Sequence, residues 1–145
     1  MPTKSNVFMN WTGVTVTPSG GSAITLTEVT DIDLIDSDTL EMWQADGHKF
    51  PTLCIAADAK RGMTIHGGDV YKLAALPKNT PCTIVAVLND AVNKAGVGSM
   101  TVTLSNAVVA DTSAKGQTNK FAGGQVSFAA FSPDGTTDPL AIAQA

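Results

Sequence analysis

Residues 13–27 have the sequence GVTVTPSGGSAITLT, in which apolar and small polar residues alternate on both sides of a turn. Alternation with a period of two is typical of strands that bury one face. Residues 18–21, Pro-Ser-Gly-Gly, interrupt it with residues that favour turns. The stretch therefore predicts a β-hairpin whose second strand has Ile24 and Leu26 on one face and threonines on the other.

The same alternation recurs along the chain and indicates a protein built mainly of strands. We expect strands at 7–17, 23–30, 61–66, 83–88, 100–110 and 125–131. Ile32 and Leu34 continue the even-numbered apolar face of the second strand, whereas Val29 breaks it. This break predicts a bulge or twist near residues 28–30.

One short helix is expected at residues 69–76. Asp69 is a good N-cap, Val70, Leu73 and Leu76 form one apolar stripe, and Pro77 ends the run. The stripe has the spacing of a helix that packs one face against a sheet. The predicted fold class is thus mainly β, a β-sandwich or partly rolled β-barrel flanked by this helix.

The chain of 145 residues is expected to form a single domain over 1–145, because domains commonly have roughly 100–150 residues. Thirteen acidic and nine basic residues give a net charge of −4, and Arg61 is the only arginine. Nucleic-acid binders usually have a basic surface, so that class is disfavoured. No apolar run has the length of a signal peptide or membrane span, which predicts a protein made in the cytosol without a membrane partner.

Nothing in the sequence matches a catalytic or metal-binding motif. The sequence lacks G-x-S-x-G, P-loop and G-x-G-x-x-G patterns. An enzyme would need a cleft that joins His48 or His66 to a carboxylate. Cys54 and Cys82 are flanked by apolar residues and fit no metal-ligand spacing, so we expect two buried free thiols; the alternative is a disulfide or redox pair. We predict no enzyme activity, no catalytic or metal-binding residues, and no cofactor.

The densest acidic cluster is DIDLIDSD at residues 31–38. It is not a calcium loop, because Asp36 occupies the position that requires glycine. On a strand, Asp31 and Asp33 share one face and form an acidic patch. This patch is either a solvated edge or a negatively charged functional surface.

Residues 36–58 show few regular signals and are expected to form a long loop outside the core. Such loops are commonly functional or flexible. An exposed Trp43 with Met42 and Phe50 would suit a subunit interface, since aromatic residues and Met are enriched there. Alternatively, Trp43 folds back onto the sandwich. Residues 111–124 are a second segment without regular signals.

Four sequence segments, taken in order, resemble segments of phage tail tube proteins, the major tail proteins of tailed bacteriophages and related phage-tail-like particles. They are GVTV at 13–16, the strand and helix at 61–76, the segment 101–109 with its Asn-Ala-Val-Val, and VSFAAFSPDG at 126–135. The resemblance covers most of the chain. It implies a β-sandwich or partly rolled barrel flanked by one helix, the fold class that the periodicity also indicates.

The resemblance implies a structural virion protein that forms rings, usually hexameric, which stack into a hollow tail tube. DNA passes through this tube during ejection without specific binding. The implied partners are other copies of the chain, the tail terminator, the tail tip or baseplate, and tape-measure proteins. The implied location is the virion tail, with assembly in the host cytoplasm. The alternative is a β-sandwich module for capsid decoration or host recognition.

A lumen through which DNA slides should be acidic or neutral, because a basic wall would hold phosphates. The candidates for the lumen face are therefore the acidic pair and the small polar residues of the strand at 100–105. They are Asp31, Asp33, Thr101, Thr103 and Ser105. The threonines have a second explanation, since Thr is simply favoured in strands.

Overall fold

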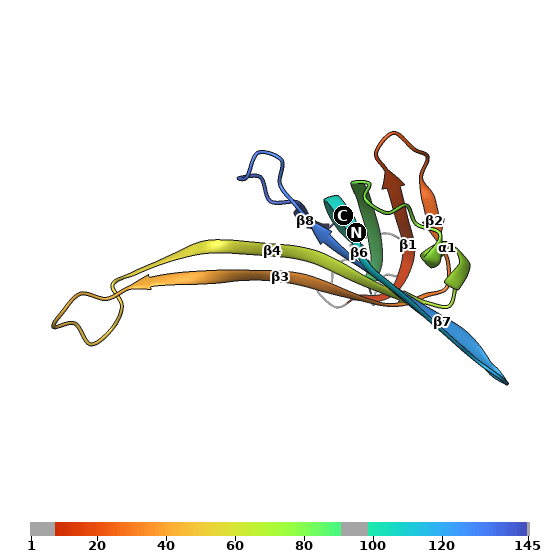
Figure 1. Ribbon diagram of the computed structural model, residues 1–145, viewed down its shortest axis with the longest axis horizontal. Helices are drawn as coiled ribbons and strands as arrows, with labels where there is room; N and C mark the ends of the chain where they lie inside the picture. Colours follow the sequence, from red (N-terminus) through yellow and green to blue (C-terminus); the bar gives the residue numbers. More distant parts are fainter. Residues whose placement is uncertain (1–7, 91–98, 145) are drawn as a thin grey trace, which may run out of the picture.

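The computed structural model describes residues 8–90 and 99–144, which form antiparallel strands and one short helix (Figure 1). The elements are β1 (Phe8–Pro18), β2 (Ile24–Leu26), β3 (Val29–Trp43), β4 (Leu53–Gly67), α1 (Val70–Ala74), β5 (Cys82–Asp90), β6 (Met100–Gln117), β7 (Lys120–Ala130) and β8 (Leu140–Gln144). The expected mainly β fold with a single short helix is confirmed. Val7, the first residue of the expected first strand, lies outside the described residues.

The strands form one open sheet in the order β2-β1-β5-β6-β7-β4-β3, with β8 also paired to β6. β6 is long enough to belong to two layers. Its residues 100–107 pair with β5, and its residues 107–117 pair with β7. We call β2, β1, β5, the start of β6 and β8 the first layer, and the rest of β6 with β7, β4 and β3 the four-strand layer. In Figure 1 the first layer stands on one side of the four-strand layer.

The chain passes from the first layer into the four-strand layer twice, each time at a residue with left-handed backbone conformation. Glu28, with φ of 57°, connects β2 to β3, and Asn106, with φ of 53°, lies within β6. The pairing of β3 with β4 also shifts register between Val29 and Asp31. The expected irregularity near residues 28–30 is confirmed, and its physical reason is this change of layer. Gly67 allows the close approach, since a Cβ there would lie 2.8 Å from the Glu28 carbonyl oxygen.

The core lies between the layers and takes alternate residues from the strands of both. The first layer contributes Val14, Val16, Ile84, Ala86, Val102 and Leu104, and the four-strand layer contributes Met63, Ile65, Val126 and Phe128. Ile32 and Leu34 pack against its rim. The apolar residues of each alternating strand therefore face the core, as the sequence predicts, and the polar residues between them lie on the outer faces.

Helix α1 covers the end of the core beside β6 and β7. The Asp69 side chain accepts a hydrogen bond from the Lys72 backbone N–H, which confirms Asp69 as the N-cap. Leu73 and Leu76 are buried. A Cβ on Gly124 would lie 3.2 Å from the Ser113 carbonyl oxygen of β6, a tight contact, and 3.5 Å from Leu73 Cδ1, an ordinary contact distance.

Both segments expected to be irregular are hairpins. β3 extends to Trp43 and β4 begins at Leu53, so only residues 44–52 of the expected 36–58 loop connect strands. We call residues 36–60 the arm, which projects beyond the body in Figure 1. Its strand character escapes the alternation signal because both of its faces are exposed and polar residues occupy both. Residues 111–124 are likewise the paired ends of β6 and β7.

Two further expectations change. Cys82 is buried as predicted, but Cys54 lies on the arm and is exposed. The prediction for Cys54 was wrong because its apolar neighbours, Leu53 and Ile55, are exposed on the arm and do not belong to the core. β8 lies outside the strands that the sequence predicts, and it pairs with residues 100–104 of β6.

Phe128 provides a test of the core between the layers. Replacing it by Ala should lower the free energy of unfolding by about 3–5 kcal/mol, because a large buried side chain leaves a cavity. Phe131→Ala is the matched control, since Phe131 is 45% exposed and should cost much less. Denaturant unfolding of the dilute protein measures both. Equal losses would contradict the placement of Phe128.

Candidate assembly surfaces

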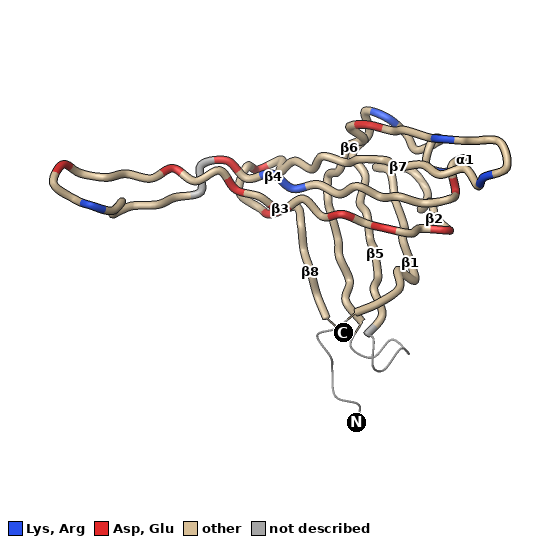
Figure 2. Tube along the Cα trace, turned by 90° about the horizontal axis from the view of Figure 1, so that it is seen from below, with Lys and Arg blue, Asp and Glu red and all other residues tan. Residues whose placement is uncertain are grey.

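The outward face of the four-strand layer, which points away from the core, is built from small and polar residues in register. One row across the strands is Asp31, His66, Gln125 and Ser113; the next is Asp33, Thr64, Ser127 and Asp111. His66 Nε2 lies 3.3 Å from Asp33 Oδ2, and the Thr64 and Ser127 hydroxyls are 3.2 Å apart. Figure 2 shows acidic residues recurring along β3 at one side of this layer.

The lumen candidates fall on two different faces. Asp31 and Asp33 lie on the outward face of the four-strand layer, because the intervening Ile32 packs against the core. Thr101, Thr103 and Ser105 alternate with the buried Val102 and Leu104 of the first layer. They therefore lie on the opposite side of the sandwich. The two sets cannot line one patch within a subunit.

The four-strand layer has an unpaired edge on each side. Within the described residues, β3 pairs only with β4, and residues 108–117 of β6 pair only with β7. The N–H and C=O groups on the outer sides of these strands therefore point to solvent. Such edges can accept a further strand, and proteins normally cover them or use them for assembly.

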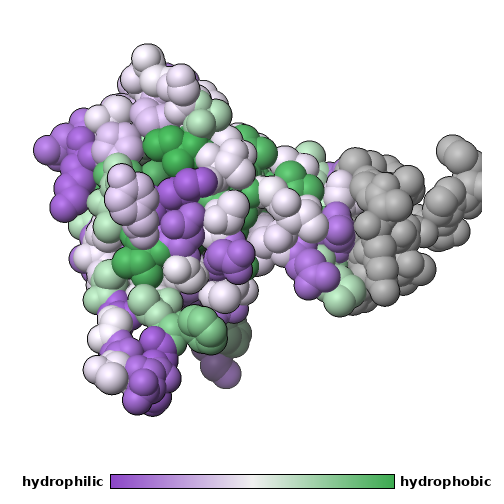
Figure 3. All heavy atoms as spheres, turned by 90° about the vertical axis from the view of Figure 1, so that its right-hand side faces the viewer, coloured by the Kyte–Doolittle hydropathy of each residue, from purple (hydrophilic) through white to green (hydrophobic). Residues whose placement is uncertain are grey.

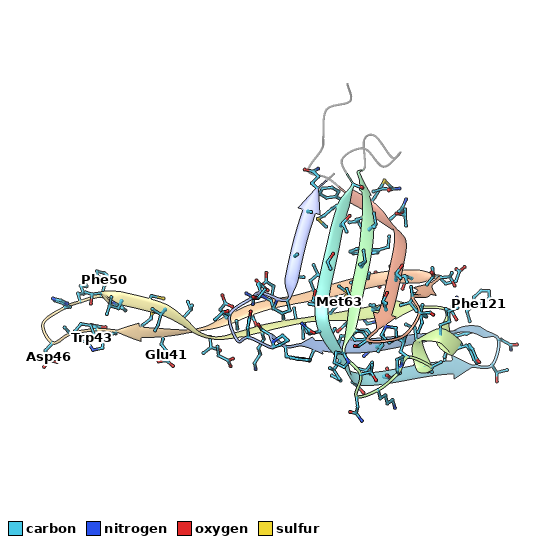
Figure 4. All side chains as sticks on the ribbon, turned by 90° about the horizontal axis from the view of Figure 1, so that it is seen from above. Glu41, Trp43, Asp46, Phe50, Met63 and Phe121 are labelled. Atoms are coloured by element: carbon cyan, nitrogen blue, oxygen red, sulfur yellow. The ribbon has the colours of Figure 1, made fainter. Side chains whose placement is uncertain are left out.

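The arm carries a concentration of exposed apolar side chains. Met42 is 59%, Trp43 57% and Phe50 70% exposed, and Leu40, Leu53 and Ile55 are exposed as well. Trp43 and Phe50 lie near the far end of the arm in Figure 4. Trp43 therefore does not fold back onto the sandwich. Clusters of exposed apolar residues commonly mark interaction surfaces.

Arg61 joins the base of the arm to the connection between β7 and β8. Its Nη1 lies 3.0 Å from Oδ1 of Asp36 and 3.0 Å from Oδ1 of Asp38, while its Nε lies 3.2 Å from Oδ1 of Asp138. The hydrogen bond to Asp38 raises the pKa of Arg61 above its ordinary value, and Asp138 and Asp36 act in the same direction. The Leu140 backbone N–H, with help from Arg61, lowers the pKa of Asp138.

Sequence reasoning missed this cluster, because the alignment of Arg61 with the acidic run is known only once the β3–β4 register is known. The only arginine of the chain aligns with the acidic run in the β3–β4 register, where Arg61 pairs with Asp36. A lone arginine among acids on an adjacent strand is a candidate for a structural ion-pair cluster.

The two histidines lie far apart in the fold. His48 belongs to the connection at the end of the arm, and His66 lies near the end of β4 in the body. His66 does contact Asp33, but on the outward face of the sheet.

Among the residues that the structure describes, no three His, Cys, Asp or Glu side chains form a possible metal site. In the same residues, no helix has the length and apolar character needed to cross a membrane.

The end of the molecule opposite the arm carries the β6–β7 turn and α1. Phe121 near this turn is fully exposed, and Tyr71 on α1 is largely exposed. Seen from this end, apolar and polar residues are interspersed (Figure 3). Lys115 and Lys120, beside His66 and Gln125, line an open depression on the outward face.

Comparisons with known proteins identify the fold. No family model and no curated protein matches the sequence. A chain in the six-fold symmetrised cryo-EM structure of the anti-feeding prophage baseplate matches with a TM-score of 0.64 and 11% identity, over 99% of this chain and 97% of that one.

Two further structures extend the likeness. A chain of the sheath-tube complex of an extracellular contractile injection system, in its extended state, has a TM-score of 0.60 and 13% identity, over 91% and 88% of the two chains. A chain of the anti-feeding prophage cap has a TM-score of 0.55 and 16% identity, over 100% and 97%. The protein thus has a fold that occurs in the injection particles of these two systems.

The Arg61 cluster generates a test of how the arm is held. Arg61→Met should increase amide hydrogen exchange at the arm base and in residues 132–139, because three carboxylates lose their shared partner. Lys60→Met is the matched control, since the exposed Lys60 side chain is a cation next to Arg61 but not a member of the cluster. Exchange that rises equally in both variants would contradict the role assigned to Arg61.

Proposed function

We propose that this chain is a non-enzymatic structural subunit of a phage-tail-like particle, that it forms rings, and that the rings stack into a hollow tail tube. The observation that carries the proposal is the pair of unpaired edges on opposite sides of the four-strand layer. The shared fold supports it, since one similar chain belongs to a sheath-tube complex and another to a six-fold symmetrised baseplate.

The number of strands in this layer suits a ring. Its four strands alternate in direction, so β3 and β6 run in opposite senses. Rotation about a ring axis keeps each strand's direction along that axis. The β3 edge of one subunit therefore meets the β6 edge of the next as an antiparallel neighbour. Such head-to-tail contacts close into a ring and leave no edge of this layer unpaired.

The two faces of the four-strand layer suit different sides of the ring. The first layer and α1 cover the core side of the four-strand layer. This additional layer fits outside the barrel wall, where the circumference is larger, and not inside the bore. The outward face, with Asp31 and Asp33, then lines the bore, and Thr101, Thr103 and Ser105 face away from it. A wall of small, neutral and acidic residues does not attract phosphates. The passage of DNA through this bore is a prediction from the family resemblance.

The arm contacts a neighbouring subunit in the same ring or the next one. Met42, Trp43 and Phe50 are exposed in the single chain and would be covered in the assembly. The cluster at Arg61 fixes the direction in which the arm leaves the body. The particle's other parts, such as a terminator and a baseplate, would bind the two ends of the tube.

The assembly state of the purified chain tests the proposal. We expect rings or tubes that increase with protein concentration, seen by negative-stain microscopy and by sedimentation velocity, with a bore wide enough for duplex DNA. A chain that stays monomeric or trimeric at all concentrations would overturn the proposal. That result would favour a β-sandwich module for capsid decoration or host recognition.

Trp43 tests the arm as an interface. Trp43→Ala should raise the concentration needed for assembly by roughly 10-fold or more, because aromatic anchors commonly carry much of the binding energy. The melting temperature of the dilute monomer should change little, since Trp43 is more than half exposed. Tyr71→Ala, at an exposed aromatic residue on α1, is the control. A large loss of monomer stability with unchanged assembly would remove Trp43 from the interface.

A further inference from the structure

We infer that the ring contact has one particular register, in which Lys115 on β6 of one subunit lies opposite Asp31 on β3 of the next. The inference rests on the proposed ring. It specifies which residues pair where two subunits meet. The pairing in turn sets how far each subunit is offset along the ring axis from its neighbour.

Both residues lie where such a contact would form. Asp31 is on β3 and Lys115 is on the part of β6 whose outer side is unpaired. In the register of the layer, Asp31 pairs with His66 and Lys115 pairs with Gly123, and these positions belong to the outward face, where His66 and Lys115 line the same depression. When a sheet continues across a subunit boundary, paired residues keep the same face. Asp31 and Lys115 can therefore be direct cross-strand neighbours.

Their charges are available for a partner. Asp31 and Lys115 are exposed, and in the described part of the chain neither takes part in an ion pair. The other acids near the base of β3 are engaged: Asp33 contacts His66, and Asp36 and Asp38 contact Arg61.

Several β3–β6 registers keep Asp31 on the outward face, and the charges of the paired residues distinguish between them. If each row continued straight into the same row of the next subunit, Asp31 would face Ser113 and Asp33 would face Asp111. A shift of two residues in one direction places Asp31 opposite Asp111. The same shift in the other direction places Asp31 opposite Lys115 and Asp33 opposite Ser113. Like charges directly opposite each other destabilise a sheet and opposite charges stabilise it, so the last register is favoured.

A shifted register also suits a closed barrel. Strands in a barrel are tilted, and the hydrogen-bond register must be staggered around the circumference for the barrel to close. Straight rows in every subunit would give no stagger at the boundaries. The shift chosen by Asp31 and Lys115 contributes one step of two residues at each boundary.

Paired cysteines measure the register directly. In a Cys54→Ser background, D31C with K115C should give a ladder of disulfide-linked oligomers when assembled protein is mildly oxidised. The matched pair D31C with S113C, which would lie opposite each other in straight rows, should not. A ladder from the second pair alone would overturn the register but leave the proposed ring intact. Intact rings without a ladder from either pair would overturn the β3–β6 contact.

Charge reversal tests the same contact without cysteines. K115E should raise the concentration needed for assembly by roughly 3- to 10-fold at low salt, and less at high salt because surface charges are screened. Adding D31K to K115E should restore most of the loss. Lys78→Glu makes the same charge change away from both edges and should have no effect. Wild-type protein that forms no rings would overturn the proposed function itself, whereas rings indifferent to K115E would overturn only the register.

Discussion

The backbone groups along the outer sides of β3 and the distal half of β6 impose the constraint on which the rest depends. Among residues 8–90 and 99–144, this antiparallel layer ends in two long edges with rows of unpaired N–H and C=O groups. Edges of this kind invite pairing with any available strand. A second copy of the chain brings the complementary edge at the correct polarity. In the proposed ring, these edges therefore connect the fold of one chain to the assembly of many.

The two left-handed residues make these edges possible. Glu28 and Asn106 let the chain leave the first layer and enter the four-strand layer within one residue. The first layer and α1 can then cover the core side of the four-strand layer within the body, while the arm, the edges and the outward face stay open. A sheet that curled smoothly into a closed barrel would have no edge to offer. Local backbone conformation at these two positions thus contributes to the open sandwich.

The sequence predicts the parts of this fold in which one face is buried. Val14, Val16, Val102 and Leu104 alternate with polar residues, and all four lie in the core. The arm could not be recognised as strand because neither of its faces is buried, so polar residues occupy positions that alternation would make apolar. The Arg61 cluster joins residues up to 77 positions apart in the chain. Only the pairing of β3 with β4 and the path of the β7–β8 connection bring them together.

The distribution of charge on β3 also bears on which edge meets which. β3 contains Asp31, Asp33, Asp36, Asp38 and Glu41 and no basic residue. Two β3 strands paired with each other would place acids close together and offer no basic partner in any register along this run, which opposes a symmetric dimer. The distal half of β6 contains Lys115, so the β3–β6 contact allows an attractive pair. In the proposed ring, the acidic balance of the chain therefore has two effects. It keeps the bore from attracting phosphates, and at β3 it favours head-to-tail contacts over a symmetric pairing.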